Sequence, residues 1–435
     1  NSEYVLRTTN GGQSWEDVTS TPAPGGAYAG RGFSGLVTTA VRFNPYQQGH
    51  AVLMGMDDGK FWQSRDALQT WTWGGQNMPH WGGGNDVTFA GPAGAVLYAS
   101  FGQQGGYGGI GKSVDGGKTW NIAPESAFPG LGSDKIALGV YALPSNPDKA
   151  WAVVGNRLYR SENGGTSWVQ ALPNVPVSYL AALKNAPATF YVSSSAGVYR
   201  TTDGSQFTLL PGSPAGATRL RVDPTSDQRL YVTAWRAGHG GLWKFENNAW
   251  TRISNNTMIA DVDVDPANSQ RLVVATNDHP YHDASYASGV WLSDNAGQSW
   301  RQQNEGLAML RIETIRFNPF KAGELVLGTH GRGFFRGQLT TTTMTTTAAR
   351  PQPAAGAWAV YPNPAGRGQL TVRGPAAGLV RYSLLDVRGR ARLTGSFEAS
   401  GAPLTLPVGQ LSAGVYFLHL EHNGQKTVHR VVIGR

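Results

Sequence analysis

The sequence predicts an all-β protein: a seven-bladed β-propeller followed by a small antiparallel β-sandwich at the C-terminus. The 435 residues include 58 Gly and 45 aromatic side chains, a composition that favours short strands joined by tight turns. A turn motif recurs at intervals of about 40 to 55 residues, which is typical of repeat architectures. The last segment, 358–435, alternates apolar and polar residues as half-buried strands do. We therefore expect two domains, since this length exceeds one ordinary core.

The recurring motif reads Ser/Thr-x-Asp/Asn-x-Gly-x-Ser/Thr-Trp. Its Asp or Asn can accept hydrogen bonds from the amides of its own turn, its Gly tolerates a positive φ, and its Trp begins the next strand. The motif thus predicts a structural hairpin turn, and none of its Asp or Asn residues is expected to be catalytic. Full copies end at Trp15, Trp120, Trp168 and Trp300, degenerate copies end at Trp71 and Phe207, and one unit keeps only Trp250.

Each motif closes a unit of four expected strands, the size of one propeller blade. In the first full unit the strands are expected at 37–43, 51–56, 60–64 and 70–73, and the closing aromatics mark six such blades. A seventh blade has strands at 312–317, 324–329 and 333–337 but no fourth. Residues 13–18 could supply that strand and close the ring. The simpler interpretation is that residues 1–19 end an earlier blade and that the natural protein extends further N-terminally, where a second propeller could lie.

The expected organisation is therefore 1–24 as the end of a preceding blade or a ring-closing strand, 25–338 as the propeller, 339–357 as a Thr/Pro/Ala-rich linker and 358–435 as the sandwich. The net charge of +8 is concentrated at the C-terminal end, where residues 351–435 carry nine Lys/Arg and three Asp/Glu. The remaining 350 residues carry 27 Lys/Arg and 25 Asp/Glu. The propeller is therefore nearly neutral without a basic stripe, and no nucleic-acid partner is expected. No run of 18 apolar residues exists, so we expect no membrane span. Without cysteine the chain has no disulfide or thiol chemistry.

The long insertions fall on one face of the predicted propeller, opposite the repeated turns. They lie at 21–34, 76–86, 101–111, 234–241 and 277–289 and are rich in Gly, aromatic residues and His. Long loops on a rigid scaffold usually carry function, and exposed aromatic rings suit the apolar faces of sugars. The alternative for each aromatic residue is a place in the core. The ligand-binding candidates are Trp62, Trp81, Tyr107, Trp235, His279, Tyr281 and His282.

Two acidic residues, Asp57 and Asp58, fall in the second-to-third turn of the first blade, on the loop-bearing face. Either could act as a general acid or base, with Asp57 the stronger candidate; the alternative is a solvated turn. Residues 277–283 gather two His and two Asp, which suits a metal site, but loops often collect such residues without metal. We expect no metal and no cofactor.

The motif resembles the Asp-box, or bacterial neuraminidase repeat. The segments 30–45 and 51–62, with Met54-Gly55-Met56-Asp57-Asp58-Gly59 at their centre, resemble the opening of a propeller in the xyloglucanase family of glycoside hydrolases (family 74). That resemblance implies inverting cleavage of β-glucan between two facing propellers, with Asp57 as one catalytic carboxylate. Lys60 replaces a family Gly, and this chain contains no second propeller to supply a partner Asp. Sortilin-like propellers, which bind without cleaving, share the architecture.

The C-terminal segment carries Val360-Tyr-Pro-Asn-Pro364, Leu384-Leu-Asp-Val-Arg-Gly389 and Leu411-Ser-Ala-Gly-Val-Tyr416 in order. It is similar to the type A sorting domain of the type IX secretion system of Bacteroidetes. The resemblance implies that the secretion machinery recognises residues 358–435 and that the protein is secreted or displayed on the outer cell surface. We therefore predict a glycan-directed propeller whose partner is a polysaccharide or cell-surface glycan, possessing or lacking hydrolase activity. The alternative is a non-catalytic, sortilin-like propeller that binds protein or glycan.

Overall fold

The structure is a computed structural model. It describes residues 5–31, 37–56, 61–78, 83–103, 107–183, 186–235, 240–278, 287–307, 309–339, 358–361, 365, 369–374, 378–386, 389–399, 403–423 and 425–434. Two compact units divide near residue 341. Nearly all regular structure is β, and the short 3-10 helices are η1 (Pro24–Gly26), η3 (Pro92–Gly94) and η4 (Glu125–Ala127). Within the described residues, no helix has the length and apolar character needed to cross a membrane.

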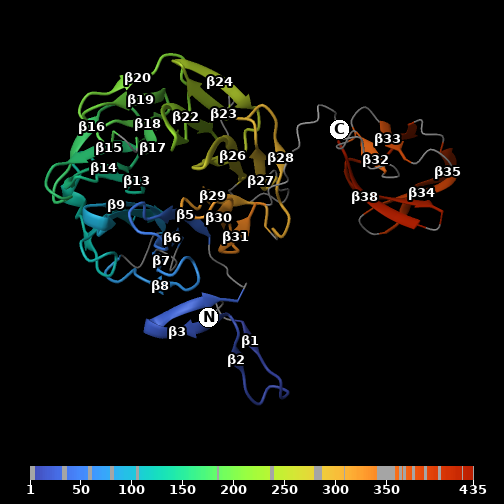
Figure 1. Cartoon of the computed structure of the whole chain (residues 1–435), viewed down its shortest axis with the longest axis horizontal. Coiled ribbons are helices and arrows are strands. Elements are labelled where there is room, and N and C mark those ends of the chain that lie inside the picture. The colour runs from blue at the N-terminus through green and yellow to red at the C-terminus, as the bar shows by residue number, and fades with distance from the viewer. Residues whose placement is uncertain are drawn as a thin grey trace. The chain divides into compact units, whose positions relative to one another are not determined.

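The first unit contains seven consecutive antiparallel sheets arranged around a ring, which is the predicted seven-bladed propeller (Figure 1). In each sheet the strands follow one another in chain order from the inside outward. Blade 1 comprises β5 (Thr38–Phe43), β6 (Ala51–Gly55), β7 (Trp62–Ser64) and β8 (Thr72–Trp73). Blade 2 comprises β9 (Gly84–Ala90), β10 (Val96–Gln103), β11 (Tyr107–Ser113) and β12 (Asn121–Ile122). Blade 3 comprises β13 (Ala137–Leu143), β14 (Asn146–Val154), β15 (Arg157–Ser161) and β16 (Val169–Leu172).

The remaining blades repeat this order, and the last has three strands. Blade 4 comprises β17 (Val177–Ala182), β18 (Phe190–Ser194), β19 (Gly197–Thr201) and β20 (Thr208–Leu209), and blade 5 comprises β21 (Arg219–Asp223), β22 (Ser226–Ala234), β23 (Gly241–Glu246) and β24 (Ala249–Ser254). Blade 6 comprises β25 (Ile259–Asp265), β26 (Asn268–Thr276), β27 (Val290–Ser293) and β28 (Arg301–Gln302). Blade 7 comprises β29 (Ile312–Phe317), β30 (Glu324–Thr329) and β31 (Phe334–Gln338).

The ring closes between blades 7 and 1. The first strand of each blade contacts the first strand of the next from β5 to β29, and β29 contacts β5. A bridge joins Val37 to His330, and the rings of Trp71 and Phe334 meet edge to face at 5.0 Å. We call the apolar cluster at this junction the seam cluster; it comprises buried Val41, Ala51, Leu53, Leu68, Trp71 and Val326, with Phe43, Trp62 and Phe334 packed against it.

Two short hairpins precede the ring. In one, β1 (Leu6–Arg7) pairs with β2 (Glu16–Asp17), and in the other β3 (Ser20–Ala23) pairs with β4 (Ala27–Gly30). Residues 13–18 therefore include β2, whose described partner is β1, and they do not form an outer strand of blade 7 within the described residues. The Trp15 side chain that ends the first motif is 60% exposed, whereas Trp120 and Trp168 are buried between blades.

The repeated turns have the hydrogen bonds expected of the motif. In each of the six, the Asp or Asn Oδ1 accepts amide hydrogen bonds from residues of its own turn, as Asp115 does from Lys118 and Thr119 at 3.0 Å. Gly116 and Gly117 adopt φ of 74° and 85° in this turn. The degenerate copy places Ala67 and Leu68 at φ of 57° and 71°, a conformation that is unfavourable for non-glycine residues.

The second unit is a two-sheet β-sandwich with its own core. One sheet has the order β32-β33-β36 and the other β35-β34-β37-β38, and all the buried apolar side chains of its core lie between residues 365 and 433. The strands are β32 (Ala359–Tyr361), β33 (Gln369–Arg373), β34 (Gly378–Asp386), β35 (Ala391–Ala399), β36 (Leu404–Pro407), β37 (Gly414–His422) and β38 (Gln425–Ile433).

Candidate functional site

The blade topology separates two faces of the propeller. Because each blade is an antiparallel meander, the second-to-third turns and the connections between blades emerge on one face, which we call the loop face. The repeated turns and the first-to-second turns emerge on the other, which we call the box face. The long insertions at 76–86, 101–111, 234–241 and 277–289 connect strands at the loop face. The insertion at 21–34 differs, because its β3–β4 hairpin pairs through Tyr28 with Trp71, just before β8.

The two candidate catalytic residues, Asp57 and Asp58, lie outside the described residues, as do Trp81, His279, Tyr281 and His282. The flanks of the acidic turn are described. β6 ends at Gly55, and the amide of Met56 donates to the Val37 carbonyl at 3.0 Å. The chain therefore reaches the acidic turn on the loop face, beside the junction of blades 1 and 7.

The other aromatic candidates differ in their surroundings. Trp62 lies in β7, half-buried against the seam cluster, so its ring contributes to blade packing, the core alternative. The Trp235 indole Nε1 donates to the Asn277 carbonyl at 2.7 Å, and its amide donates to Thr218 Oγ1 at 3.1 Å. Trp235 therefore links the loops of blades 5 and 6 on the loop face. Tyr107 begins β11 opposite Gln103, and its side chain is outside the described residues.

A polar cluster that sequence reasoning missed lies on the loop face between blades 6, 7 and 1. His330 Nδ1 contacts Glu313 Oε1 at 2.5 Å, and the His330 amide donates to the Arg311 carbonyl at 3.0 Å. The guanidinium of Arg311 bonds Asp278 Oδ1 at 2.7 Å, and Asp278 is almost fully buried. His330 is the first residue after β30, so it occupies in blade 7 the position of Met56 in blade 1, one residue before Asp57. The available signal in the sequence was only that a His follows the second strand of blade 7.

The polar cluster adjoins the acidic turn through the backbone. His330 bridges Val37, and Val37 accepts the Met56 amide one residue before Asp57. Glu313 keeps 18% of its side chain exposed, whereas the imidazole of His330 is 7% exposed. The Glu313–His330 pair is therefore placed to position the backbone that enters the acidic turn.

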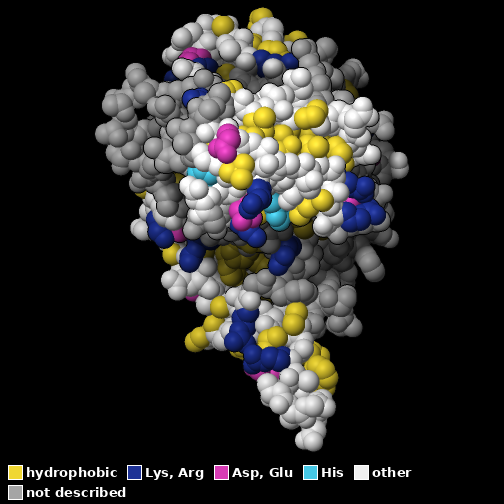
Figure 2. Space-filling view, turned by 90° about the vertical axis from the view of Figure 1, so that its right-hand side faces the viewer, with side chains coloured by type: hydrophobic (Ala, Val, Ile, Leu, Met, Phe, Trp, Pro, Cys, Tyr) yellow, Lys and Arg dark blue, Asp and Glu magenta, His cyan; other side chains and the backbone are white. Residues whose placement is uncertain are grey.

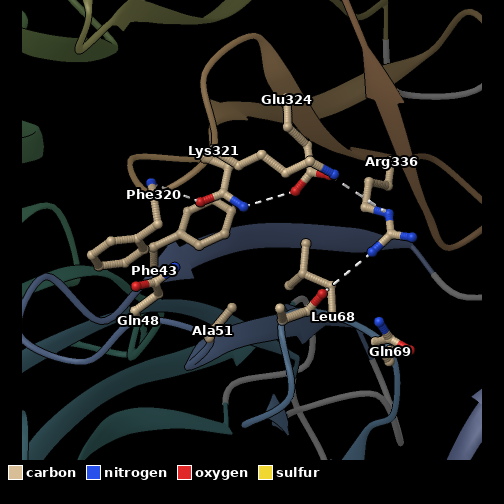
Figure 3. Close-up of a pocket in the computed structure, with 12 residues that line it drawn as sticks. Phe43, Gln48, Ala51, Leu68, Gln69, Phe320, Lys321, Glu324 and Arg336 are labelled. Carbon is tan, nitrogen blue, oxygen red and sulfur yellow. Dashed lines mark hydrogen bonds and ion pairs between the residues drawn. The ribbon is translucent and has the colours of Figure 1, made fainter.

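A pocket of about 400 Å³ opens on the box face instead, at the seam between blades 1 and 7 (Figure 3). Phe43, Leu68 and Phe320 supply its apolar walls. Its polar groups bond to one another: Asn318 Nδ2 and Lys321 Nζ donate to Glu324 at 2.7 and 2.8 Å. Because it is on the face opposite the long insertions, we assign it to the imperfect fit of the seam.

No group of three or more His, Asp or Glu side chains suited to a metal occurs among the described residues. The 277–283 segment falls largely outside them. On the face shown in Figure 2, Lys and Arg side chains are scattered among hydrophobic and acidic ones.

Comparison with known proteins assigns the second unit. Residues 359–434 match the family model of the secretion system C-terminal sorting domain. The chain therefore carries a type IX sorting domain and is an exported protein, secreted or displayed on the cell surface. This confirms the prediction made from the three C-terminal motifs.

The propeller is similar to xyloglucanases. It is 27% identical over 298 residues to a xyloglucanase of Hypocrea jecorina, covering 66% of this chain and 33% of that protein. A xyloglucanase of Paenibacillus sp. is 25% identical over 237 residues, which are 52% of this chain and 22% of the relative. The chain thus spans a third or less of the length of these two relatives.

Solved structures show the same fold. A crystal structure of a Niastella koreensis GH74 enzyme has a TM-score of 0.54 at 18% identity, covering 93% of this chain and 74% of that one. An ancestral GH74 enzyme also has a TM-score of 0.54, at 12% identity, covering 92% of this chain and 62% of the other. The predicted all-β propeller architecture is confirmed.

Proposed function

We propose that this chain is a glycan-directed propeller, exported by type IX secretion, that acts on β-glucan as a xyloglucanase-like glycoside hydrolase. The observation that carries the proposal is the similarity to a xyloglucanase across 298 residues, two thirds of the chain. The concentration of long insertions on the loop face supports it, because binding and catalytic groups concentrate in loops on rigid scaffolds. The polysaccharide would lie across this face.

In the proposed reaction Asp57 is one carboxylate of an inverting pair, with Asp58 the weaker candidate for that role. Inverting hydrolysis needs a general acid that protonates the leaving oxygen and a general base that activates water, with their carboxyl groups about 6.5–9.5 Å apart. Trp81, Tyr107, Trp235 and Tyr281 would stack on sugar rings, and His279 and His282 would bond their hydroxyl groups.

The Glu313–His330 pair would act on this chemistry through the backbone. His330 bridges Val37, which accepts the amide of Met56, so a shift of His330 is transmitted to the residue before Asp57. Displacement of a reacting group by about 1 Å can cost a hundredfold in rate. We therefore regard Glu313 and His330 as positioning residues of the proposed site.

The test is release of reducing ends from a panel of β-glucans that includes xyloglucan. The full chain is compared with Asp57→Asn, Asp58→Asn and Asp148→Asn, the last removing an exposed carboxylate paired with Lys112 on the box face. We expect release by the wild type and by Asp148→Asn, and its loss in Asp57→Asn. Release that survives in Asp57→Asn but disappears in Asp58→Asn would exchange the roles of the two residues.

Binding to the same glucans separates the proposed activity from the alternative. Absence of release together with retention on insoluble glucan would assign a non-catalytic glycan-binding propeller. Absence of both would overturn the glycan-directed function and leave the protein-binding alternative. Each glucan is tested with the purified full chain at one ionic strength, so that charge screening is constant.

A further inference from the structure

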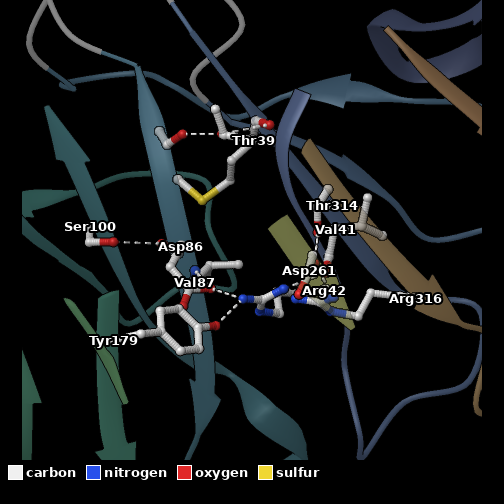
Figure 4. Close-up of polar contacts among 12 residues, drawn as sticks. Thr39, Val41, Arg42, Asp86, Val87, Ser100, Tyr179, Asp261, Thr314 and Arg316 are labelled. Carbon is white, nitrogen blue, oxygen red and sulfur yellow. Dashed lines mark hydrogen bonds and ion pairs between the residues drawn. The ribbon is translucent and has the colours of Figure 1, made fainter. Parts of the chain in front are cut away.

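Charged side chains from the inner strands of five blades meet along the axis of the propeller, and the proposed function uses none of them. Four are arginines and three are aspartates, and one tyrosine joins them. Figure 4 shows part of the group, with Arg42 between Asp86 and Tyr179 and Arg316 beside Asp261. We call this group the axial cluster; it comprises Arg42 on β5, Asp86 on β9, Arg219 and Arg221 on β21, Asp261 and Asp263 on β25 and Arg316 on β29, with Tyr179 on β17.

Each aspartate of the axial cluster is paired with one arginine. These contacts are short and lie in the interior, where ion pairs are weakly screened. The carboxylates also accept backbone amides, as Asp263 does from Phe317 at 2.8 Å. The three pairs are Arg42 Nη2 with Asp86 Oδ1 at 2.7 Å, Arg221 Nε with Asp263 Oδ1 at 3.2 Å and Arg316 Nη1 with Asp261 Oδ2 at 2.5 Å.

The fourth arginine leaves one positive charge uncompensated. The Arg219 guanidinium lies 4.6 Å from the centre of the Tyr179 ring, and among the described residues no carboxylate is within ion-pair distance of it. Tyr179 is an uncharged partner that also accepts a hydrogen bond from Arg42. Within the axial cluster four guanidinium groups therefore face three carboxylates, and Glu313 of β29 pairs with His330 instead. Arg219 is half-buried, and an unbalanced charge in a partly enclosed site is unfavourable unless water or a counter-charge compensates it.

In Arg316 one donor atom also lacks a hydrogen-bond acceptor. Its side chain is 8% exposed, and its Nε is buried with no hydrogen-bond acceptor in the described structure. Burial, followed by the positive charge of Arg221, lowers the pKa of Arg316 to about 10. A buried N–H without an acceptor is rare in native proteins, and it usually marks the place of a water molecule or an ion.

Solvent-sized species can reach the axial cluster at Arg42 and Arg221, whereas the Nε of Arg316 itself is enclosed. The side chains of Arg42 and Arg221 keep 14% and 20% of their surface accessible, although both project from inner strands. Guanidinium groups offer only donors. Water would satisfy the donors but leave the excess charge, whereas a monovalent anion would satisfy both.

We infer that the axis of the propeller binds one small monovalent inorganic anion, chloride or a related halide, through the guanidinium groups of Arg316 and Arg221. The site is distinct from the proposed glycan site, which lies in the loops of one face. Its role is to neutralise the axial cluster so that inner strands from opposite sides of the ring can approach. The inference does not depend on the proposed hydrolase activity.

The direct test is bromide substitution in crystals of the full chain. We expect an anomalous difference peak within hydrogen-bond distance of the guanidinium groups of Arg221 and Arg316. Refinement of a water molecule there, with no anomalous signal on the axis, would contradict the inference. A bromide that appears only at the surface would be an adventitious ion only and would count against it.

The second test measures thermal unfolding in chloride, in bromide and in gluconate at matched ionic strength. A ligand at ten times its dissociation constant raises the folded-to-unfolded ratio roughly tenfold, so we expect a higher midpoint in halide. Arg221→Gln leaves three cations facing three carboxylates and should remove the halide-specific rise. Arg301→Gln, which removes an exposed arginine paired with Asp294, should keep it.

Two outcomes would refute the inference in solution. One is equal wild-type midpoints in halide and gluconate, which requires no variant and so holds even if Arg221→Gln fails to fold. The other is an unchanged halide effect in a folded Arg221→Gln protein. In the latter case the halide acts on the bulk protein surface.

Discussion

The degenerate turn of blade 1 offers a sharp test of how the propeller is stabilised. Leu68 is buried in the seam cluster with Val41, Trp71 and Val326, yet its φ is 71°. This conformation costs a non-glycine residue about 1–2 kcal/mol. The Leu side chain thus offsets backbone strain by filling the junction between blades 7 and 1.

We predict that Leu68→Gly is more stable than Leu68→Ala. Both variants lose the buried side chain, which costs about 2–4 kcal/mol relative to the wild type. The glycine variant is also destabilised by about 0.5–1 kcal/mol, because glycine makes the unfolded chain more flexible. Glycine avoids the backbone strain that alanine retains. When this gain and the loss from flexibility are combined, the free energy of unfolding of Leu68→Gly should be higher than that of Leu68→Ala by about 1 kcal/mol.

The matched control is Leu53, which is buried in the same cluster but lies in the regular strand β6. There the order should reverse, with Leu53→Ala more stable than Leu53→Gly by about 1 kcal/mol. Unfolding of the four variants is followed by tryptophan fluorescence, with the midpoint as the measure. The reasoning fails if alanine is the more stable replacement at both positions.

Four further predictions follow from contacts described above. Asp115→Ala should cost about 1–2 kcal/mol through its lost turn hydrogen bonds, while Asp115→Asn should change unfolding by less than about 0.5 kcal/mol because Asn holds three other turns. Burial, followed by Arg65, lowers the pKa of His50 to about 4, below its unfolded value near 6.5. Stability should therefore fall by about 2 kcal/mol as the pH drops from 6.5 to 4, and His50→Gln should flatten the measured pH dependence. If the chain hydrolyses glucan, His330→Asn should lower kcat about tenfold or more when kcat is measured well below the unfolding midpoint of the variant, and an unchanged kcat would exclude the positioning role. Deletion of residues 359–434 should leave the propeller midpoint unchanged, since that core lies wholly within the deleted unit, and should abolish export in a secretion assay.

The architecture could be predicted from the sequence because the signals that encode it are local. The strands expected at 312–317 and 324–329 match β29 and β30 in both bounds. A tryptophan or phenylalanine after each turn marked six blades, and a seventh blade with three strands was expected after them. The structure has this three-stranded blade as β29, β30 and β31. The differences within the blades lie at strand ends, as where the strand expected at 60–64 begins at Trp62, and residues 13–18 pair with β1 instead of completing blade 7.

The site was less predictable because its contacts join residues distant in the chain. An aromatic residue in a strand beside a long loop fits a sugar platform and a core position equally well, and Trp62 packs against the seam cluster. The pairing of Glu313 with His330, and its link to Met56 through Val37, requires the ring to be closed. The axial cluster combines inner strands more than 200 residues apart, and no local pattern in the sequence indicates which charges meet.

Every blade of the propeller is continuous in sequence, and this has a mechanical consequence. β31 is hydrogen-bonded to β30, and within the described residues no strand from the N-terminal end completes blade 7. The molecule is therefore a split ring, held shut where its ends meet by the Val37–His330 bridge and side-chain packing. Under load, such a ring opens first at the split, because parting blades 7 and 1 breaks no blade sheet. Pulling on residues 37 and 338 should thus give an early, low-force extension before any blade unravels.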